Sequence, residues 1–299
     1  MVPTRLSRTR FRLGTSYLLD SLSLARAHRI RKRLHGMRRH KMAVFANDHI
    51  GLVINFFGVY EKDQLKCLFD FLAPLSSRFK AGCVLDIGAN IGNHALYFSE
   101  IFGRVLAFEP HPHTYKLLEL NATFKKNVET LPIGLGASGE RARIAENPLN
   151  LGGSRISDRD EDGISVFDIE VRRLDDVVRD VASVEMIKLD VEGRELNVLQ
   201  GAWETIDRHQ PVIIFEQLKD EFRENSTPVI DALKERGYKC CWMEKRFNFS
   251  ASFLRRSLYV FEVLFGREYF VLTADRIPPR FHFMIIAIPP RYVDQLMRG

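Results

Sequence analysis

From about residue 80 onward, short apolar runs alternate with segments in which apolar residues recur every three to four positions. The short runs are rich in Val, Ile and Leu without polar alternation, which is typical of strands buried on both faces of a parallel sheet. The expected strands are residues 83–88, 104–110, 128–137, 186–193, 211–217, 238–244 and 281–289. The expected helices between them are residues 93–102, 113–125, 195–206 and 227–237.

This alternation predicts an α/β fold with a doubly wound, mostly parallel seven-stranded sheet and helices on both faces. The main domain is expected to cover residues 46–299, with two interruptions. Residues 141–178 predict short strands around a Gly-Gly loop on the ligand side, and residues 245–270 form a Phe-rich insertion before the last strand. An open sheet of this kind binds its ligand beyond the carboxyl ends of its strands.

Residues 1–45 are predicted to form a basic, partly helical extension. Three interpretations of it stay open: a helix packed on the main domain or on a second subunit of a homodimer, a segment that contacts anionic lipid or an acidic polymer, and an organelle-targeting segment. Apolar residues recur in it at roughly helical spacing, with Arg and Lys between them: Leu18, Leu22, Ala25, Ile30 and Leu34.

The formal net charge of +6 on this 299-residue chain is unevenly distributed. Residues 1–41 contain twelve Lys or Arg and a single acid, whereas residues 42–299 contain 32 basic and 37 acidic residues. The main domain is therefore not expected to bind nucleic acid, which usually requires a basic face. The extension leaves open a peripheral contact with an anionic membrane.

Cysteine spacing and hydropathy indicate a cytoplasmic protein, either free or peripheral to the inner face of a membrane. The four cysteines show no CxxC spacing and are expected to be reduced. No apolar run reaches the roughly 18–20 residues that a membrane span requires.

The stretch "CVLDIGANIGNHALYF", residues 83–98, combines a strand, a glycine turn and the start of a helix. Gly88 lets the backbone leave the strand at angles closed to other residues, and Gly92 permits close approach of the helix and a ligand. Asp86, at the strand end, is expected to face the mouth of the turn. A carboxylate there repels a pyrophosphate but favours a ligand with an ammonium or sulfonium group.

A second acid, Glu109, ends the following strand in "FEP". An acid at this position accepts hydrogen bonds from both ribose hydroxyls of a bound nucleoside. A nucleoside with a cationic amino-acid tail is S-adenosylmethionine, which is the cofactor that the two acids together predict.

The segments that carry a family resemblance are "VLDIGANIGNHALYFS", "RVLAFEPHPHTYKLLELNATFK", "GLGASGE", "LDDVV", "MIKLDVEGRELNVLQGAWETI" and "PVIIFEQ". Over about residues 80–217, the sequence resembles the FkbM family of methyltransferases. The resemblance implies a class I, Rossmann-like fold and methyl transfer from S-adenosylmethionine, commonly to hydroxyl groups of sugars, glycans or polyketides. It implies that Glu109 holds the ribose and that Ala137 and Ser138 lie near the adenine. The turn at the methionine end would consist of Asp86, Gly88, Asn90, Gly92 and Asn93.

The segment "IKLDVEGRE" contains the candidates for chemistry, because an alcohol acceptor needs a base or a metal to remove its proton. Asp190 is the first candidate for base or cofactor anchor, and Glu216 is a second acid facing the same cleft. Lys188 either orients the acceptor or, with a lowered pKa, removes its proton. The alternatives are a buried Lys188–Asp190 ion pair and, for Glu192, a role in capping the next helix.

Other polar residues compete with this set. His94, His111 and His113 are expected to pack or to lie away from the methyl group rather than to act as bases. Asn150, Ser154 and Arg155, in the Gly-Gly loop, are candidates for hydrogen bonds to acceptor hydroxyls, together with Glu192. Asp190 with Glu216 would be the acids to hold a divalent metal, although no metal is predicted.

The sequence therefore predicts an S-adenosylmethionine-dependent O-methyltransferase acting on a hydroxyl of a saccharide, a glycolipid or a related natural product. One alternative is an RNA or protein methyltransferase guided by the basic extension, although the fourth strand lacks an N/D-P-P-[YFW] sequence. Another is a non-catalytic nucleoside-binding protein associated with a membrane.

Overall fold

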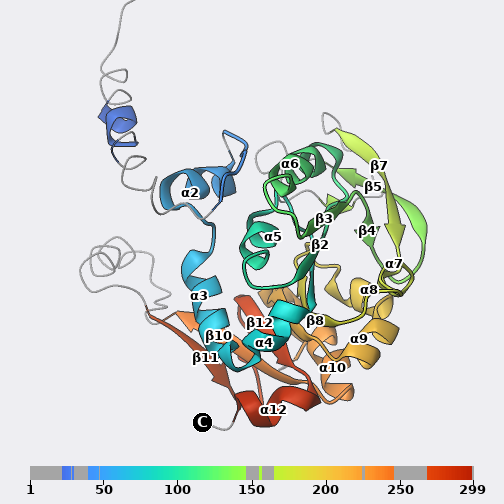
Figure 1. The fold of residues 1–299 in the computed structure, drawn as a ribbon. Helices are drawn as coiled ribbons and strands as arrows, with labels where there is room; N and C mark the ends of the chain where they lie inside the picture. The colour runs from blue at the N-terminus through green and yellow to red at the C-terminus, as the bar shows by residue number, and fades with distance from the viewer. Residues whose placement is uncertain are drawn as a thin grey trace, which may run out of the picture.

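The computed structural model describes residues 22–27, 29, 40–46, 48–145, 155–156, 165–223, 226–245 and 268–297 (Figure 1). Residues 22–27 are helical, and the basic extension as a whole stays a prediction. The remainder of residues 1–39, the Gly-Gly loop and most of the Phe-rich insertion lie outside the described residues. Along the parts of the chain that the structure describes, no helix is long and apolar enough to cross a bilayer.

A large sheet of eight strands runs through the molecule in the order β11-β10-β12-β9-β8-β1-β2-β3. The five strands from β3 to β9 are parallel, while β12 pairs antiparallel with both β9 and β10. This confirms the predicted doubly wound, mostly parallel sheet. Its strands are β1 (Cys83–Ile87), β2 (Arg104–Phe108), β3 (Val128–Leu131), β8 (Val184–Leu189), β9 (Val212–Gln217), β10 (Lys239–Lys245), β11 (Tyr269–Thr273) and β12 (His282–Ile288).

Helices cover both faces of this sheet, because alternate side chains of each buried strand point to opposite faces. Leu85 and Ile87 of β1 lie in one apolar core, which α8, α9 and α10 close, and Val84 lies in the other, which α3, α4, α5 and α12 close (Figure 1). The helices are α3 (Lys62–Phe71), α4 (Ser76–Ala81), α5 (Asn93–Phe98), α6 (Pro112–Ala122), α7 (Leu174–Val177), α8 (Glu195–Gln200), α9 (Trp203–His209), α10 (Pro228–Glu235) and α12 (Pro290–Leu296), with short 3-10 turns η1 (Ala73–Leu75) and η3 (Lys219–Glu221).

The prediction of seven strands is wrong by one, and the additional strand is β11. It begins at the end of the predicted Phe-rich insertion and pairs antiparallel with β10 over Tyr269–Thr273. A short run such as "YFVLT" carries no periodicity strong enough to separate a strand from packed aromatics. The edge of the sheet therefore lies one strand further out than the sequence indicates.

The predicted third strand, residues 128–137, is divided at Pro132. Pro has no amide hydrogen to donate to a strand partner, so the ladder with β2 ends at Leu131. The following residues join a separate four-stranded sheet in the order β4-β7-β5-β6, which is the predicted interruption between the main strands. Its strands are β4 (Gly134–Leu135), β5 (Glu140–Ala145), β6 (Arg155–Ile156) and β7 (Val166–Arg172).

The chain before residue 80 also belongs to the domain. Helix α2 (His49–Phe57) is followed by α3 and α4, and none of the three is anticipated from the sequence. Buried Asn121 of α6 fixes this region, because its side chain pairs with the backbone amide (2.7 Å) and carbonyl (2.9 Å) of Ala43 and donates to the carbonyl of Ile91 (2.8 Å). One amide side chain thus joins the N-terminal segment to the glycine turn.

The end of α8 packs against the loop after β4 with no room for a side chain. A Cβ on Gly201 would lie 2.0 Å from the carbonyl oxygen of Gly136, so only glycine permits this approach. The contact positions the strand ends around the cavity described below.

We expect Gly201→Ala to lower the free energy of unfolding by about 1–3 kcal/mol, because the two backbones must move apart. Gly139→Ala is the matched control, since the nearest neighbour of its new Cβ is 4.0 Å away, and it should change stability by less than about 0.5 kcal/mol. Urea unfolding of both variants measures the difference. Equal midpoints would show that the Gly136–Gly201 approach is not a constraint.

Candidate active site

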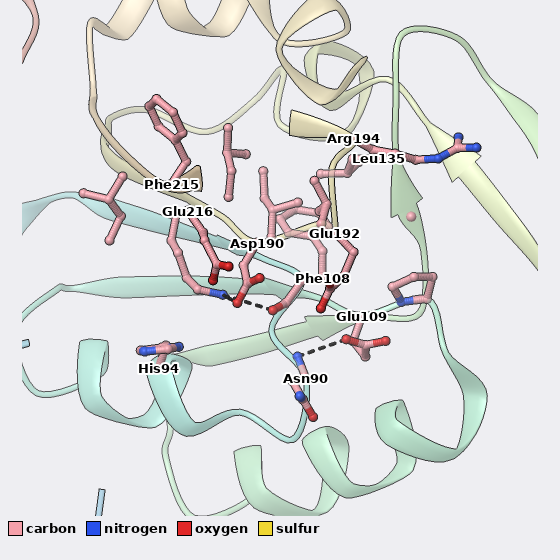
Figure 2. Close-up of a pocket in the computed structure, with 18 of the residues that line it drawn as sticks. Asn90, His94, Phe108, Glu109, Leu135, Asp190, Glu192, Arg194, Phe215 and Glu216 are labelled. Atoms are coloured by element: carbon pink, nitrogen blue, oxygen red, sulfur yellow. Dashed lines mark hydrogen bonds and ion pairs between the residues drawn. The ribbon is translucent and has the colours of Figure 1, made fainter. Parts of the chain in front are cut away.

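A cavity of about 250 Å³ opens at the carboxyl ends of β1, β2, β8 and β9. The fold places it there because the crossover connections leave the strand ends free on this side of the sheet. Its walls include five carboxylates, whereas its basic side chains are Lys188, Arg194 and the histidines of positions 49 and 94. In Figure 2, Asp190, Glu192 and Glu216 gather on one side of the cavity, and Glu109 lies with Asn90 on another.

The glycine turn forms the floor of this cavity, and two of its residues require unusual backbone angles. Gly88 has φ +74°, and a Cβ there would lie 1.9 Å from the carbonyl oxygen of Asp190, so the turn and the end of β8 touch through backbone alone. Asn90 also has a positive φ (51°) and lines the cavity. Both were predicted for the turn.

Gly92 allows a close contact between helices. Its φ is +91°, and a Cβ there would lie 2.8 Å from a methyl group of Leu118 in α6. It does not line the cavity. Glycine is thus required here for the packing of α5 against α6, and the predicted approach of a ligand stays a prediction.

Lys188 joins the two sides of the turn. Its Nζ lies 3.3 Å from Asp86 Oδ1 and 3.3 Å from Asp190 Oδ2, and it donates to the carbonyl of Gly88 at 3.1 Å. Burial lowers the pKa of Lys188, but the carboxylates of Asp190 and Asp86 raise it by more, so the net pKa is above its ordinary value. The alternative in which a lowered pKa lets Lys188 remove a proton is therefore wrong, and the ammonium stays charged.

Asp86 lies behind the cavity wall rather than at its mouth. It alternates with Leu85 and Ile87 along β1 and sits directly beside Lys188 on β8, and its side chain is fully buried. Among the residues that the structure describes, neither of its oxygens accepts a hydrogen bond, so the ion pair with Lys188 is the interaction that stabilises this buried carboxyl group. The prediction that Asp86 faces the ligand is not supported by this position.

Glu109 follows β2 directly and lines the cavity on the side away from Asp190, Glu192 and Glu216. Its two oxygens accept from the backbone amides of Asn90 (2.9 Å) and His111 (2.8 Å), which fixes the carboxylate in one orientation. Burial raises the pKa of Glu109 to about 7, and the two amides and Lys188 oppose that rise. Each oxygen keeps a second lone pair for a ligand donor.

A second side of the cavity is lined by three acids, Asp190, Glu192 and Glu216, which were predicted from the sequence to share one cleft. Asp190 is partly exposed, with 44% of its side chain accessible, and Glu192 has a left-handed backbone (φ 53°) just before Gly193 (φ 87°). Burial, and then the charges of Asp190 and Glu192, raise the pKa of Glu216 to about 7. Burial, with the neighbouring carboxylates adding to it, thus brings the titration of Glu216 to near neutral pH.

Two cavity residues, Tyr60 and Glu61, come from the N-terminal segment and were missed. Asn93, predicted to bind the cofactor, instead uses its side chain on Tyr60, accepting from its amide at 2.9 Å and donating to its carbonyl at 3.1 Å. Glu61 has φ 57° and pairs with His94 at 3.2 Å, and both line the cavity. The signal that could have revealed them is the helical spacing of Leu65, Leu68, Leu72 and Leu75, which places a helix directly after this turn.

The remaining candidates are more distant or lie outside the described residues. Ile133, Gly134 and Leu135 line the cavity where Ala137 and Ser138 were predicted to do so, and Ser138 is exposed. Asn150 and Ser154 lie outside the described residues, as does the side chain of Arg155. Their predicted contacts with an acceptor stay predictions.

Two further histidines, His111 and His113, follow Glu109 in the sequence. His111 caps α6 through Thr114, and His113 makes edge-to-face ring contacts with His111 and Phe167. Neither histidine lines the cavity. Among the described residues, no group of three or more His, Cys, Asp or Glu side chains is arranged to hold a metal ion.

The sheet order, the glycine turn and the acid after β2 together define a class I methyltransferase fold. The chain belongs to the FkbM methyltransferase family: the model of the methyltransferase FkbM domain matches residues 86–240, more than half of the chain. The resemblance stated from the sequence is confirmed. The chain is therefore a methyltransferase by family.

Individual relatives match over shorter segments. The chain is 28% identical to methyltransferase sdnD of Sordaria araneosa, covering 41% of this chain and 62% of that protein. It is 30% identical to the hexuronic acid methyltransferase AglP of Haloferax volcanii, covering 43% of this chain and 53% of that one. A crystal structure of an FkbM methyltransferase from Methylobacillus flagellatus is 24% identical, with a TM-score of 0.34 over 46% of this chain and 33% of that chain.

We expect Lys188→Met to lower the free energy of unfolding by about 3–5 kcal/mol, because it leaves the buried carboxylate of Asp86 without a partner. The double variant Asp86→Asn/Lys188→Met should recover much of this loss, since neither buried charge remains. Chemical denaturation of the single and double variants gives the coupling between the two sites.

Lys66→Met is the matched control for this cycle. Its ion pair with Asp70 lies on the surface, with 71% of the lysine side chain exposed, and its removal should leave stability unchanged within error. Additive losses in the Asp86/Lys188 double variant would contradict the buried pair as the source of the effect.

Proposed function

We propose that this protein transfers the methyl group of S-adenosylmethionine to a hydroxyl of a saccharide, a glycolipid or a related natural product. The observation that carries the proposal is the cavity at the carboxyl ends of the parallel strands, where Glu109 is fixed by two backbone amides beside an acidic wall. Family membership supplies the reaction class. The relatives align over only part of their length, so the acceptor is inferred from the chemistry of the cavity.

The residues of the cavity fit the cofactor. Glu109 retains one lone pair on each oxygen, which matches two adjacent ribose hydroxyls. The sulfonium and ammonium groups suit walls that carry the five carboxylates Glu61, Glu109, Asp190, Glu192 and Glu216. A pyrophosphate would be repelled by the same walls, which argues against a dinucleotide.

The acidic wall also selects among acceptors. A hexuronic acid, named in the relative from Haloferax volcanii, offers oxygen nucleophiles but no nitrogen nucleophile. Between its two kinds of oxygen, the cluster of Asp190, Glu192 and Glu216 favours a neutral hydroxyl over a carboxylate, because like charges at this distance repel. The acidic main domain likewise argues against RNA, whose phosphates require a basic surface.

The cofactor supplies an activated methyl group, and the protein must align the acceptor and remove its proton. We assign proton removal to Asp190 and Glu216. Lys188 holds Asp190 in place through the 3.3 Å ion pair, and the raised pKa of Glu216 makes it a suitable proton acceptor near neutral pH. Tyr60, held by Asn93, closes the cavity on the side of the N-terminal segment.

We expect Asp190→Asn to reduce the methyl-transfer rate by roughly 10²–10⁴-fold, the contribution typical of a general base. Cofactor affinity should fall much less than the rate, because Asp190 is one of five carboxylates that line the cavity and the ribose is assigned to Glu109. A radiolabel transfer assay against a pool of glycans, together with calorimetry, separates the two effects. Wild-type turnover in this variant would reject the assignment.

Glu109→Gln should give the opposite pattern. Losing the charge that faces the ribose hydroxyls should weaken cofactor binding by roughly 10- to 100-fold, the range of a hydrogen bond to a charged group. Transfer at saturating cofactor should fall much less. Unchanged affinity for S-adenosylmethionine in this variant would remove the basis for placing the ribose at Glu109.

A pH dependence follows from Glu216. Its pKa of about 7 leaves it mostly protonated below neutral pH, so the transfer rate at saturating cofactor should rise with pH and level off above about 7. One pH unit below that value, the rate should be about a tenth of the plateau. Glu216→Gln should be slower and lack this limb, and a rate profile unchanged in shape would exclude Glu216.

A further inference from the structure

Helix α2 presents an apolar face that no other described residue covers. Leu52, Phe56 and Phe57 are 45%, 39% and 65% exposed, although the helix is short and otherwise well anchored. Asp48 caps its start by accepting from the amide of Gly51 at 3.2 Å, and Ile54 is buried beneath it. Large side chains gathered on one helix face are typical of an interaction surface rather than of solvent.

The helix is held rigidly enough to present this face. A Cβ on Gly51 would lie 2.2 Å from the carbonyl oxygen of Phe45, so α2 packs backbone to backbone on the segment that Asn121 fixes. In Figure 1, α2 lies at the edge of the molecule, away from the two helical layers. Its first turn lines the cavity through His49 and Ile50, while Leu52, Phe56 and Phe57 do not.

The sequence directly before α2 is strongly basic. Residues 26–41 contain eight Lys or Arg, and no acid occurs between Asp20 and Asp48. A basic stretch next to exposed Phe and Leu is the combination that binds an anionic lipid surface, because each cation is attracted to the headgroups and the apolar side chains enter the boundary of the acyl region.

A second copy of the chain or a nucleic acid would suit either the exposed apolar side chains or the basic stretch, but not both. A second copy of the chain would carry the same positive charge in its own residues 26–41, and the two basic stretches would repel each other. A nucleic acid would bind the cations but offers little to an aliphatic side chain such as Leu52. We propose that the α2 face, defined as Leu52, Phe56 and Phe57, docks on an anionic membrane surface.

The test is flotation of the full-length protein with vesicles of phosphatidylcholine alone and of phosphatidylcholine with an equal amount of phosphatidylglycerol. The wild type should float with the anionic vesicles only. Phe56→Ser/Phe57→Ser should weaken binding by roughly tenfold for each aromatic side chain removed from the lipid boundary. Added salt should weaken wild-type binding as it screens the basic stretch.

A matched control pair exists elsewhere on the surface. Phe124 and Phe281 are each 50% exposed, and Phe124→Ser/Phe281→Ser should float like the wild type. Flotation of Phe56→Ser/Phe57→Ser equal to the wild type would overturn the proposal. So would a change from dimer to monomer in light scattering, or a fall in melting temperature, because either shows that the face is covered by protein.

The outcome is independent of the proposed catalytic function. Phe56 and Phe57 do not line the cavity, so their replacement should leave S-adenosylmethionine binding by calorimetry unchanged. A wild-type protein that binds the cofactor but ignores anionic vesicles would overturn the docking surface alone. A wild-type protein that floats but binds no cofactor would overturn the proposed function alone.

Discussion

The site depends on one buried cation. Lys188 lies between Asp86 and Asp190 and also binds the carbonyl of Gly88, so a single side chain connects β1, β8 and the glycine turn. Two neighbouring carboxylates this close would otherwise repel each other in a medium of low polarity. With the ammonium in place, one carboxylate is buried beneath the cavity wall while the other is held at the cavity. Lys188, which contacts the buried Asp86, therefore fixes the position of the cavity carboxylate Asp190.

Two asparagines extend this organisation to the N-terminal segment. Asn121 binds Ala43 and Ile91, and Asn93 binds the backbone of Tyr60 on both sides. Both act on backbone groups that no strand or helix satisfies, and such groups are costly to bury unpaired. A family match that begins at residue 86 does not include the segment that they fix. The cavity is nonetheless incomplete without it, because Tyr60 and Glu61 form part of its wall.

The alternation of parallel strands with helices, the glycine turn and the acid after β2 were predictable from the sequence, because each leaves a local pattern. Side-chain direction was not predictable with the same success. Asp86 was expected at the mouth of the turn, but the alternation along β1 directs its side chain to the α5 face of the sheet. Its partner there, Lys188, lies on the neighbouring strand β8, and the local sequence around Asp86 does not indicate this contact. Asn93 is likewise committed to Tyr60, a contact 33 residues away along the chain that no local pattern encodes. The strand β11 was missed because its pairing partner, not its own sequence, defines it.

The placement of β12 has a consequence for how the sheet is assembled. Strands β10 and β11 join the rest of the sheet only through β12, which pairs with β9 on one side and β10 on the other and comes last in the chain. During synthesis from the N-terminus, β1, β2, β3, β8 and β9 can pair as soon as they emerge. Strands β10 and β11 can join the sheet only after β12 has been synthesised. Until then the apolar side chains of Cys241, Trp242 and Met243, which are buried in the folded protein, remain exposed to solvent. The interval before β12 emerges is thus when the nascent protein is most exposed to aggregation and most in need of a chaperone.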